Sequence, residues 1–130
     1  MEQINRLLTV SILGCGGRGF RTYGRLMHKL PDKFKIVALC DTNADAVAIA
    51  AKEFGVSADN CFTSDEEFLI KKRSDVLVIA TLDKQHYAHA MKAMQLGYDI
   101  LLEKPITDDR QQCLDLIATQ KKYGNKVVVC

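Results

Sequence analysis

The sequence predicts an α/β domain in which helices cover both faces of a doubly wound parallel sheet, giving three layers. Short apolar runs alternate with segments of helical periodicity along all 130 residues, as in parallel sheets built from strand–helix–strand units. The runs over residues 7–13 and 75–80 are almost continuously apolar, which is typical of strands buried on both faces. A glycine-rich turn, residues 14–19, directly follows the first of these runs.

Each element has its own local signal. The expected strands are residues 7–13, 35–40, 60–62, 75–80, 99–102 and 126–130. The expected helices are residues 20–30, 44–54, 65–71 and 84–96, and a last one between Thr107 and Gly124. Asp83 and Thr107 are candidate N-caps, and Gly55, Gly97 and Gly124 mark helix ends. Right-handed crossovers then predict the strand order 3-2-1-4-5-6, with a ligand at the carboxyl ends of the strands where the order reverses.

Composition narrows the function classes. A chain that is 48% hydrophobic and 26% charged is expected to form one globular domain over residues 1–130. Its net charge of +2 is small, and its basic residues are scattered. We therefore expect neither nucleic acid nor an anionic membrane surface as a partner. No apolar run approaches the length of a membrane span.

The five cysteines predict free thiols in a reducing cytoplasm. Their number is odd, and none lies in a C-x-x-C pair, so neither a disulfide framework nor a metal site is expected. Cys15 is a special case because it lies in the glycine turn, where the start of a helix could lower the pKa of a thiol. We favour the simpler interpretation that a small side chain fits the turn.

The glycine turn carries the main functional signal. Gly14, Gly16 and Gly19 form a G-x-G-x-x-G pattern after a strand, and Asp41 ends the next strand 22 residues after Gly19. This is the dinucleotide-binding fingerprint of a Rossmann-type fold. Gly14 permits the tight turn, Gly16 lets the backbone approach a pyrophosphate, and Gly19 lets the helix pack closely on the sheet. Asp41 would bind the ribose hydroxyls and repel a 2′-phosphate, which favours NAD over NADP.

Two alternatives stay open for these residues. A glycine-rich turn can arise for packing reasons alone. An aspartate after a strand can also be a helix cap or a loop residue.

A second group of residues follows the later strands. Thr81 ends the run over residues 75–80, His86 lies near the start of the next expected helix, and Glu103-Lys104-Pro105 follows the fifth strand. The carboxyl ends of these strands converge on one crevice in an open α/β sheet.

Four stretches carry a family resemblance. They are residues 12–19 (Ile-Leu-Gly-Cys-Gly-Gly-Arg-Gly), 38–41 (Ala-Leu-Cys-Asp), 79–81 (Ile-Ala-Thr) with His86, and 97–105 (Gly-Tyr-Asp-Ile-Leu-Leu-Glu-Lys-Pro). The chain resembles the nucleotide-binding half of the glucose-fructose oxidoreductase, inositol dehydrogenase and MocA family. It departs from that family at Thr81-Leu82-Asp83, where Thr-Pro-Asn is common.

The resemblance implies roles for individual residues. Lys104 would lie beside the nicotinamide and the reacting carbon, with His86 as a second catalytic candidate. Gly17, Arg18, Thr81, Glu103 and Pro105 would join Gly14, Gly16, Gly19 and Asp41 in holding the cofactor. Arg18 would reach the pyrophosphate or remain in solvent. Alternatively, Lys104 only pairs with Glu103 or solvent, and His86 is structural. His28 and His89 lack motif support, so we expect both on helix surfaces.

The expected function is that of the NAD-binding domain of an oxidoreductase. Hydride would pass between the nicotinamide and a carbinol carbon of a sugar, inositol or related small molecule. The resemblance also implies a second domain after residue 130, which would contact substrate and form a homo-oligomer, so this chain alone should be inactive. Two alternatives are a non-catalytic NAD-binding sensor or scaffold module and an NAD-dependent glycosidase of the same family.

Overall fold

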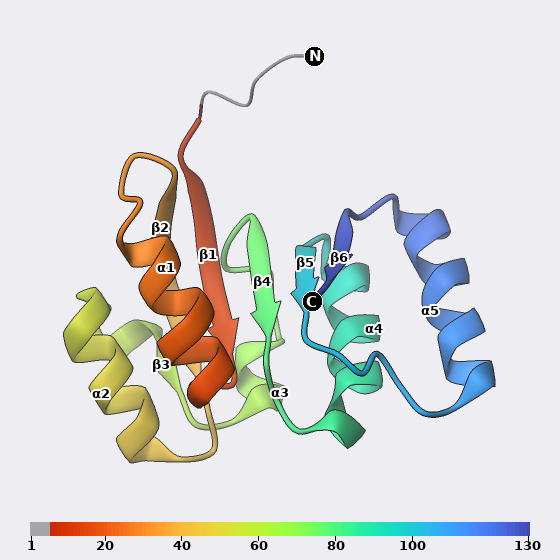
Figure 1. Cartoon of the computed structure of the whole chain (residues 1–130), viewed down its shortest axis with the longest axis horizontal. Helices are drawn as coiled ribbons and strands as arrows, with labels where there is room; N and C mark the ends of the chain where they lie inside the picture. Colours follow the sequence, from red (N-terminus) through yellow and green to blue (C-terminus); the bar gives the residue numbers. More distant parts are fainter. Residues whose placement is uncertain (1–5) are drawn as a thin grey trace.

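A computed structural model describes residues 6–130, and residues 1–5 of the expected domain lie outside the described part (Figure 1). Its strands form one parallel six-stranded sheet in the order β3-β2-β1-β4-β5-β6. The strands are β1 (Leu8–Leu13), β2 (Phe34–Cys40), β3 (Cys61–Phe62), β4 (Val76–Ile79), β5 (Asp99–Leu102) and β6 (Val127–Val129). The predicted strand order and the Rossmann-type fold are confirmed.

Helices cover both faces of the sheet. They are the π-helical η1 (Gly17–Gly24), which continues into α1 (Arg25–His28), then α2 (Ala44–Phe54), α3 (Asp65–Phe68), α4 (His86–Leu96) and α5 (Arg110–Tyr123). Two short 3₁₀ turns, η2 (Ala58–Asn60) and η3 (Asp83–Gln85), precede β3 and α4. Figure 1 shows η1–α1 beside α2 at one side of the molecule, and α4 and α5 at the other.

Each face of the sheet has its own hydrophobic core. Ile12 and Val78 face the core that contains Phe20 of η1 and Phe54 of α2. The neighbouring residues of β4 face the other core, which contains Phe68 of α3, Met94 of α4 and Leu116 of α5. Because successive side chains of a strand point to opposite faces, two buried faces explain the continuous apolar runs. Helices therefore bury apolar side chains on both faces of the sheet.

Three predicted helix boundaries were wrong. The helix expected over 65–71 ends at Phe68, because the guanidinium group of Arg73 donates hydrogen bonds to the carbonyl oxygens of Phe68 (2.8 Å) and Glu67 (3.0 Å). The helix expected from residue 20 begins earlier, at Gly17, after the extended residue Gly16. The helix expected from residue 84 begins as α4 only at His86, after the turn η3.

Two predicted N-caps were also wrong. Asp83 lies inside η3 and makes no cap to α4. Asp109 caps α5 instead of Thr107, since its side chain accepts a hydrogen bond from the backbone N–H of Gln112 (2.9 Å). The Thr107 hydroxyl instead supports this start by donating to the Gln112 side chain (2.6 Å). Helix ends were predicted correctly at Gly55, Gly97 and Gly124, all with positive φ.

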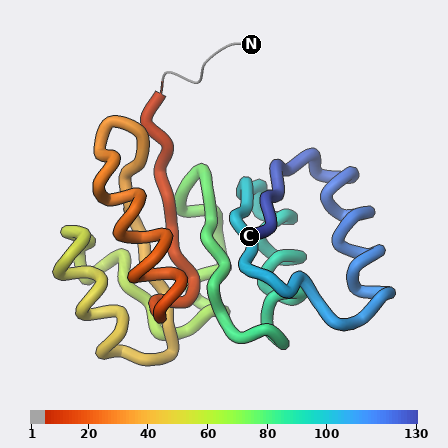
Figure 2. The backbone as a smooth tube through the Cα atoms, viewed as in Figure 1, coloured from red at the N-terminus to blue at the C-terminus, as the bar shows by residue number. Residues whose placement is uncertain are grey.

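The order of the strands creates a crevice beside β1. The chain runs outward from β1 to β2 and β3, then returns to β4 on the other side of β1 (Figure 2). The segments that leave the carboxyl ends of β1 and β4 therefore diverge to opposite faces and directions. Such a reversal is where open α/β sheets bind their ligands.

Candidate cofactor site

The three glycines of the fingerprint have different structural surroundings. Gly14 has φ +99°, and a Cβ atom there would lie 2.5 Å from the carbonyl oxygen of Ala80. A Cβ atom at Gly19 would lie 1.8 Å from the carbonyl oxygen of Gly14. These two positions require glycine for the turn and for close helix packing. A Cβ atom at Gly16 would meet no other atom within 4 Å, so the protein itself leaves this position open.

The helix after the turn presents an uncapped N-terminus. No side chain accepts a hydrogen bond at its N-cap, Gly16, and its first turn has no acidic residue. The first N–H groups of a helix lack partners within the helix and lie at its positive end. An anion at this point would receive hydrogen bonds from the backbone, and the open space at Gly16 would let a pyrophosphate approach.

Asp41 shapes the loop after β2 and also faces the cleft. Its Oδ2 accepts a hydrogen bond from the backbone N–H of Cys15 (2.7 Å), and its Oδ1 accepts one from the N–H of Asn43 (2.8 Å). The loop role that was the alternative for Asp41 is therefore present. It does not exclude binding, because each carboxylate oxygen can accept a second hydrogen bond.

These features meet in a cleft of about 350 Å³ at the carboxyl ends of β1, β2 and β4. The predicted residues in its wall are Gly14, Gly16, Asp41 and Thr81. Two further residues, Asp65 and His89, also line it. The volume lies in the range of small-ligand sites. The other predicted residues, which are outside its wall, are Gly17 to Gly19, His86, and Glu103 to Pro105.

Glu103 links the helix of the glycine turn to the end of β5. It is buried, accepts a hydrogen bond from the Tyr23 hydroxyl, and forms an ion pair with Arg18 (Nε to Oε1, 3.3 Å). The hydrogen bond to Glu103 raises the pKa of Tyr23 to about 12. Arg18, on the helix of the glycine turn, therefore pairs with a carboxylate that follows β5.

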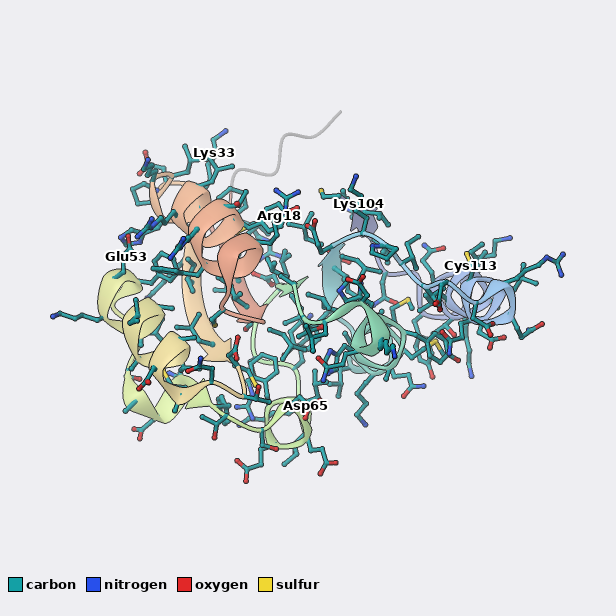
Figure 3. All side chains as sticks on the ribbon, turned by 60° about the horizontal axis from the view of Figure 1, so that its bottom comes forward. Arg18, Lys33, Glu53, Asp65, Lys104 and Cys113 are labelled. Atoms are coloured by element: carbon teal, nitrogen blue, oxygen red, sulfur yellow. The ribbon has the colours of Figure 1, made fainter. Side chains whose placement is uncertain are left out.

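Lys104 is the exposed neighbour of this pair. Its backbone N–H donates to the carbonyl oxygen of Cys130 (2.7 Å), and its peptide bond to Pro105 is cis. Within residues 6–130 its ammonium forms no ion pair, so it does not pair with Glu103. Figure 3 shows Lys104 and Arg18 on separate elements, one after β5 and the other on the helix of the glycine turn.

His86 is buried and bonded to backbone on two sides. Its Nδ1 lies 2.6 Å from the carbonyl oxygen of Pro105, and its Nε2 lies 2.9 Å from that of Thr81. Both ring nitrogens are occupied, and the ring is fully buried. This geometry favours the structural alternative for His86, in which it joins the segments that follow β4 and β5.

The prediction that His89 lies on a helix surface was wrong. Its side chain is 6% exposed, its Nδ1 lies 3.0 Å from the Thr81 hydroxyl, and its Nε2 lies 2.7 Å from Oδ2 of Asp65. The spacing of His86 and His89, three residues apart on one helix, was a signal that both face the sheet. His28 is exposed, as predicted.

Cys15 belongs to a core and carries no reactive thiol. Burial, together with the nearby charge of Asp41, raises its pKa to about 12. Its side chain packs with Phe20 and Ile12. Its burial and raised pKa favour the interpretation as a small side chain that fits the turn over an activated thiol.

A family model identifies the protein family to which this chain belongs. The model of an oxidoreductase family with an NAD-binding Rossmann fold matches residues 8–130. The chain belongs to this oxidoreductase family. The resemblance inferred from the glycine turn and the Glu-Lys-Pro element is thereby confirmed.

Known members of the family and solved structures agree with this assignment. An inositol 2-dehydrogenase/D-chiro-inositol 3-dehydrogenase from Halalkalibacterium halodurans is 24% identical over 121 residues, which are 93% of this chain and 34% of that protein. The chain thus spans about a third of the length of the curated relatives it matches.

Two crystal structures show the same fold with different cofactors. The WlbA dehydrogenase from Bordetella pertussis, in complex with NADH and UDP-GlcNAcA, has a TM-score of 0.86 at 24% identity, over 96% of this chain and 37% of that one. KijD10, a 3-ketoreductase from Actinomadura kijaniata in complex with TDP-benzene and NADP, has a TM-score of 0.83 at 20% identity, over 95% and 37%.

Among residues 6–130, no group of three or more His, Cys, Asp or Glu side chains is arranged to hold a metal ion. No helix in that range is both long enough and apolar enough to cross a membrane.

Proposed function

We propose that this chain is the NAD-binding part of an oxidoreductase that transfers a hydride between the nicotinamide and a carbinol carbon of a sugar, inositol or related polyol. The observation that carries the proposal is the placement of Gly16 and Asp41 in one cleft. The open space at Gly16 lies next to an uncapped helix N-terminus, and the Asp41 carboxylate faces the same space. Pyrophosphate and ribose need these two partners at this spacing.

Asp41 supports NAD as the cofactor over NADP. Its carboxylate can accept hydrogen bonds from ribose hydroxyls, whereas a 2′-phosphate would meet a like charge. Arg18 could have offset that repulsion, but it pairs with Glu103. The basic residue within the glycine turn is thus already paired with a carboxylate.

Lys104 is the catalytic residue of the proposal. A bound nicotinamide supplies the acceptor or donor of the hydride. The unpaired ammonium of Lys104 would donate a hydrogen bond to the substrate oxygen, stabilise negative charge there and relay its proton. Two contacts support its position: the Lys104 N–H bonds to Cys130, and His86 holds the carbonyl oxygen of Pro105. We assign His86 a positioning role, since neither ring nitrogen is free to exchange a proton with substrate.

The remaining parts of the proposal concern the whole protein. We infer a further domain that supplies most substrate contacts and the surface of a homo-oligomer, since the relatives are about three times as long as this chain. We place the protein in the cytoplasm because its cysteines are free. The 130-residue chain is expected to bind NAD without turning over substrate.

Calorimetric titration with NADH and NADPH tests the cofactor assignment. NADH should bind at least about tenfold more tightly, a difference of about 1.4 kcal/mol. Asp41→Asn keeps an oxygen that can accept from Cys15 but removes the charge, so it should narrow this preference. Asp45→Asn removes the same charge from an exposed residue of α2 and should leave the preference unchanged. Equal or tighter binding of NADPH by the unmodified chain would contradict the role of Asp41.

Substitution of Lys104 separates an oxidoreductase from a sensor module. In the full-length protein, Lys104→Met should retain NADH binding and lose dehydrogenase activity on sugars and polyols. Unchanged activity would remove Lys104 from the mechanism.

A further inference from the structure

Two histidines of one helix hold Thr81 at the wall of the cleft. His86 contacts its carbonyl oxygen (2.9 Å), and His89 contacts its hydroxyl (3.0 Å). Residues three apart on a helix lie on the same face, so α4 orients both the main chain and the side chain of Thr81. Thr81 is only partly buried and lines the cleft.

His89 is connected in turn to Asp65 at the start of α3. The Nε2 atom of His89 lies 2.7 Å from Oδ2 of Asp65, whose side chain is 41% exposed. Figure 3 shows Asp65 at the α3 end of the molecule, away from Arg18 and Lys104. The hydrogen bond from His89 lowers the pKa of Asp65, so the carboxylate is ionised and only accepts hydrogen bonds.

These contacts determine the direction of each hydrogen bond when the His89 ring is neutral. Because the Asp65 carboxylate only accepts, Nε2 of His89 must carry the hydrogen. A neutral imidazole then has a lone pair on Nδ1, and the Thr81 hydroxyl donates its single hydrogen to that atom. The lone pairs of the Thr81 oxygen remain available on the side of the cleft.

We propose that Asp65, His89 and Thr81 form a hydrogen-bond relay that presents the Thr81 hydroxyl to the cofactor cleft as an acceptor. The relay would recognise a donor on the adenosine half of the dinucleotide, either the adenine amino group or a ribose hydroxyl. The adenosine half is indicated because the cleft wall that contains the relay also contains Asp41, while Lys104 is outside it. This inference rests on the proposed function, since the donor belongs to its cofactor.

Nitrogen NMR of the imidazole rings tests the direction of the relay without any ligand. The chain has three histidines, so the three rings can be assigned with two variants, His89→Gln and His28→Gln. When the His89 ring is neutral, the spectrum should show its hydrogen on Nε2. A hydrogen on Nδ1 in the neutral ring would overturn the relay. Thr81→Val should shift the Nδ1 signal of His89 and leave that of the exposed His28 unchanged.

Binding measurements test what the relay recognises. Thr81→Val should weaken NADH binding about three- to tenfold, as expected for one lost hydrogen bond, and Thr81→Ser should retain binding because it keeps the hydroxyl. Reduced nicotinamide hypoxanthine dinucleotide has a carbonyl group in place of the adenine amino group. If the amino group is the donor, the unmodified chain prefers NADH to this analogue, and Thr81→Val loses the preference. If a ribose hydroxyl is the donor, Thr81→Val weakens both ligands equally.

The positioning role of His89 has a separate readout. His89→Leu should weaken NADH binding by a factor similar to that of Thr81→Val, and the double variant should be no weaker than either single one, because the relay is already broken. If a folded Thr81→Val variant binds NADH and the hypoxanthine analogue as tightly as the unmodified chain does, the proposed role of Thr81 in binding the cofactor is overturned. If the unmodified chain binds neither dinucleotide, the proposed function fails, whereas the NMR spectrum still decides the direction of the relay.

Discussion

The substitution Gly16→Ala adds one methyl group where the protein leaves room but the proposed cofactor does not. Gly16 is extended, with φ −87° and ψ −151°, so it lies outside the left-handed region that favours glycine. The added Cβ atom would meet no other atom within 4 Å. Alanine reduces the entropy of the unfolded chain, by about 0.4–1 kcal/mol, but is a poorer N-cap than glycine by a similar amount.

The free energy of unfolding should therefore change by less than about 1 kcal/mol, which is a shift in Tm of a few degrees. Binding should respond differently, because the methyl group lies in the cleft wall where a pyrophosphate approaches the backbone. We expect NADH affinity to fall at least about tenfold, or about 1.4 kcal/mol.

Thermal unfolding and calorimetric titration of the same variant measure the two effects separately. Gly19→Ala serves as the contrast, since its Cβ atom would lie 1.8 Å from the carbonyl oxygen of Gly14. This variant should be too unstable for its NADH binding to be measured. A folded Gly16→Ala variant that binds NADH as tightly as the unmodified chain would refute the assignment of this turn to the pyrophosphate.

Two further predictions concern stability. The backbone N–H of Thr9, followed by the side chain of Arg6, lowers the pKa of Asp75 to about 2. The stabilisation of the folded state by this ionised carboxylate is complete above the ordinary aspartate pKa of about 4 and is lost as the pH falls toward 2. Asp75→Asn should therefore remove about 1–2 kcal/mol from the change in the free energy of unfolding between pH 2 and 6, measured by denaturant titration. Identical pH profiles for the variant and the unmodified chain would contradict this prediction. The fully buried Tyr98 hydroxyl accepts a hydrogen bond from the N–H of Arg73 (2.8 Å), so Tyr98→Phe should lower the free energy of unfolding by about 1–2 kcal/mol, whereas an unchanged midpoint in urea would show that this bond contributes nothing.

The helix boundaries show where local signals were insufficient. Gly55 and Gly97 end their helices as predicted, because a left-handed residue is a property of the local backbone. The end of α3 depended on Arg73, a residue whose side chain returns to the Phe68 carbonyl and stacks over the Phe62 ring (4.1 Å). A side chain that reaches back from beyond the helix leaves no mark on the periodicity of the helix itself.

The residues of the candidate site also fall into those that local signals predicted and those that they missed. Gly14, Gly16 and Asp41 were predicted from the spacing of a strand, a glycine turn and an acidic residue, and Thr81 from its place after a buried strand and from the family resemblance. All four line the cleft. His89 was missed because its partners come from two other segments: Thr81 from the loop after β4, and Asp65 from the start of α3. Its burial depends on how α4 packs against α3, which no single segment encodes.

The sequence by itself determined the class of fold, the order of the strands, the glycine turn and the family. The fold class, strand order and glycine turn depend on periodicity, turn residues and spacing, all of which act over short stretches of chain. The family was indicated by the resemblance of four sequence motifs. Only the tertiary structure decided that Glu103 pairs with Arg18 and Tyr23, that His86 is enclosed by two backbone carbonyls, and that Asp65 and His89 reach the cleft. The physical reason is that hydrogen-bond partners are chosen by proximity in space, and proximity between distant segments is set by the packing of helices on the completed sheet.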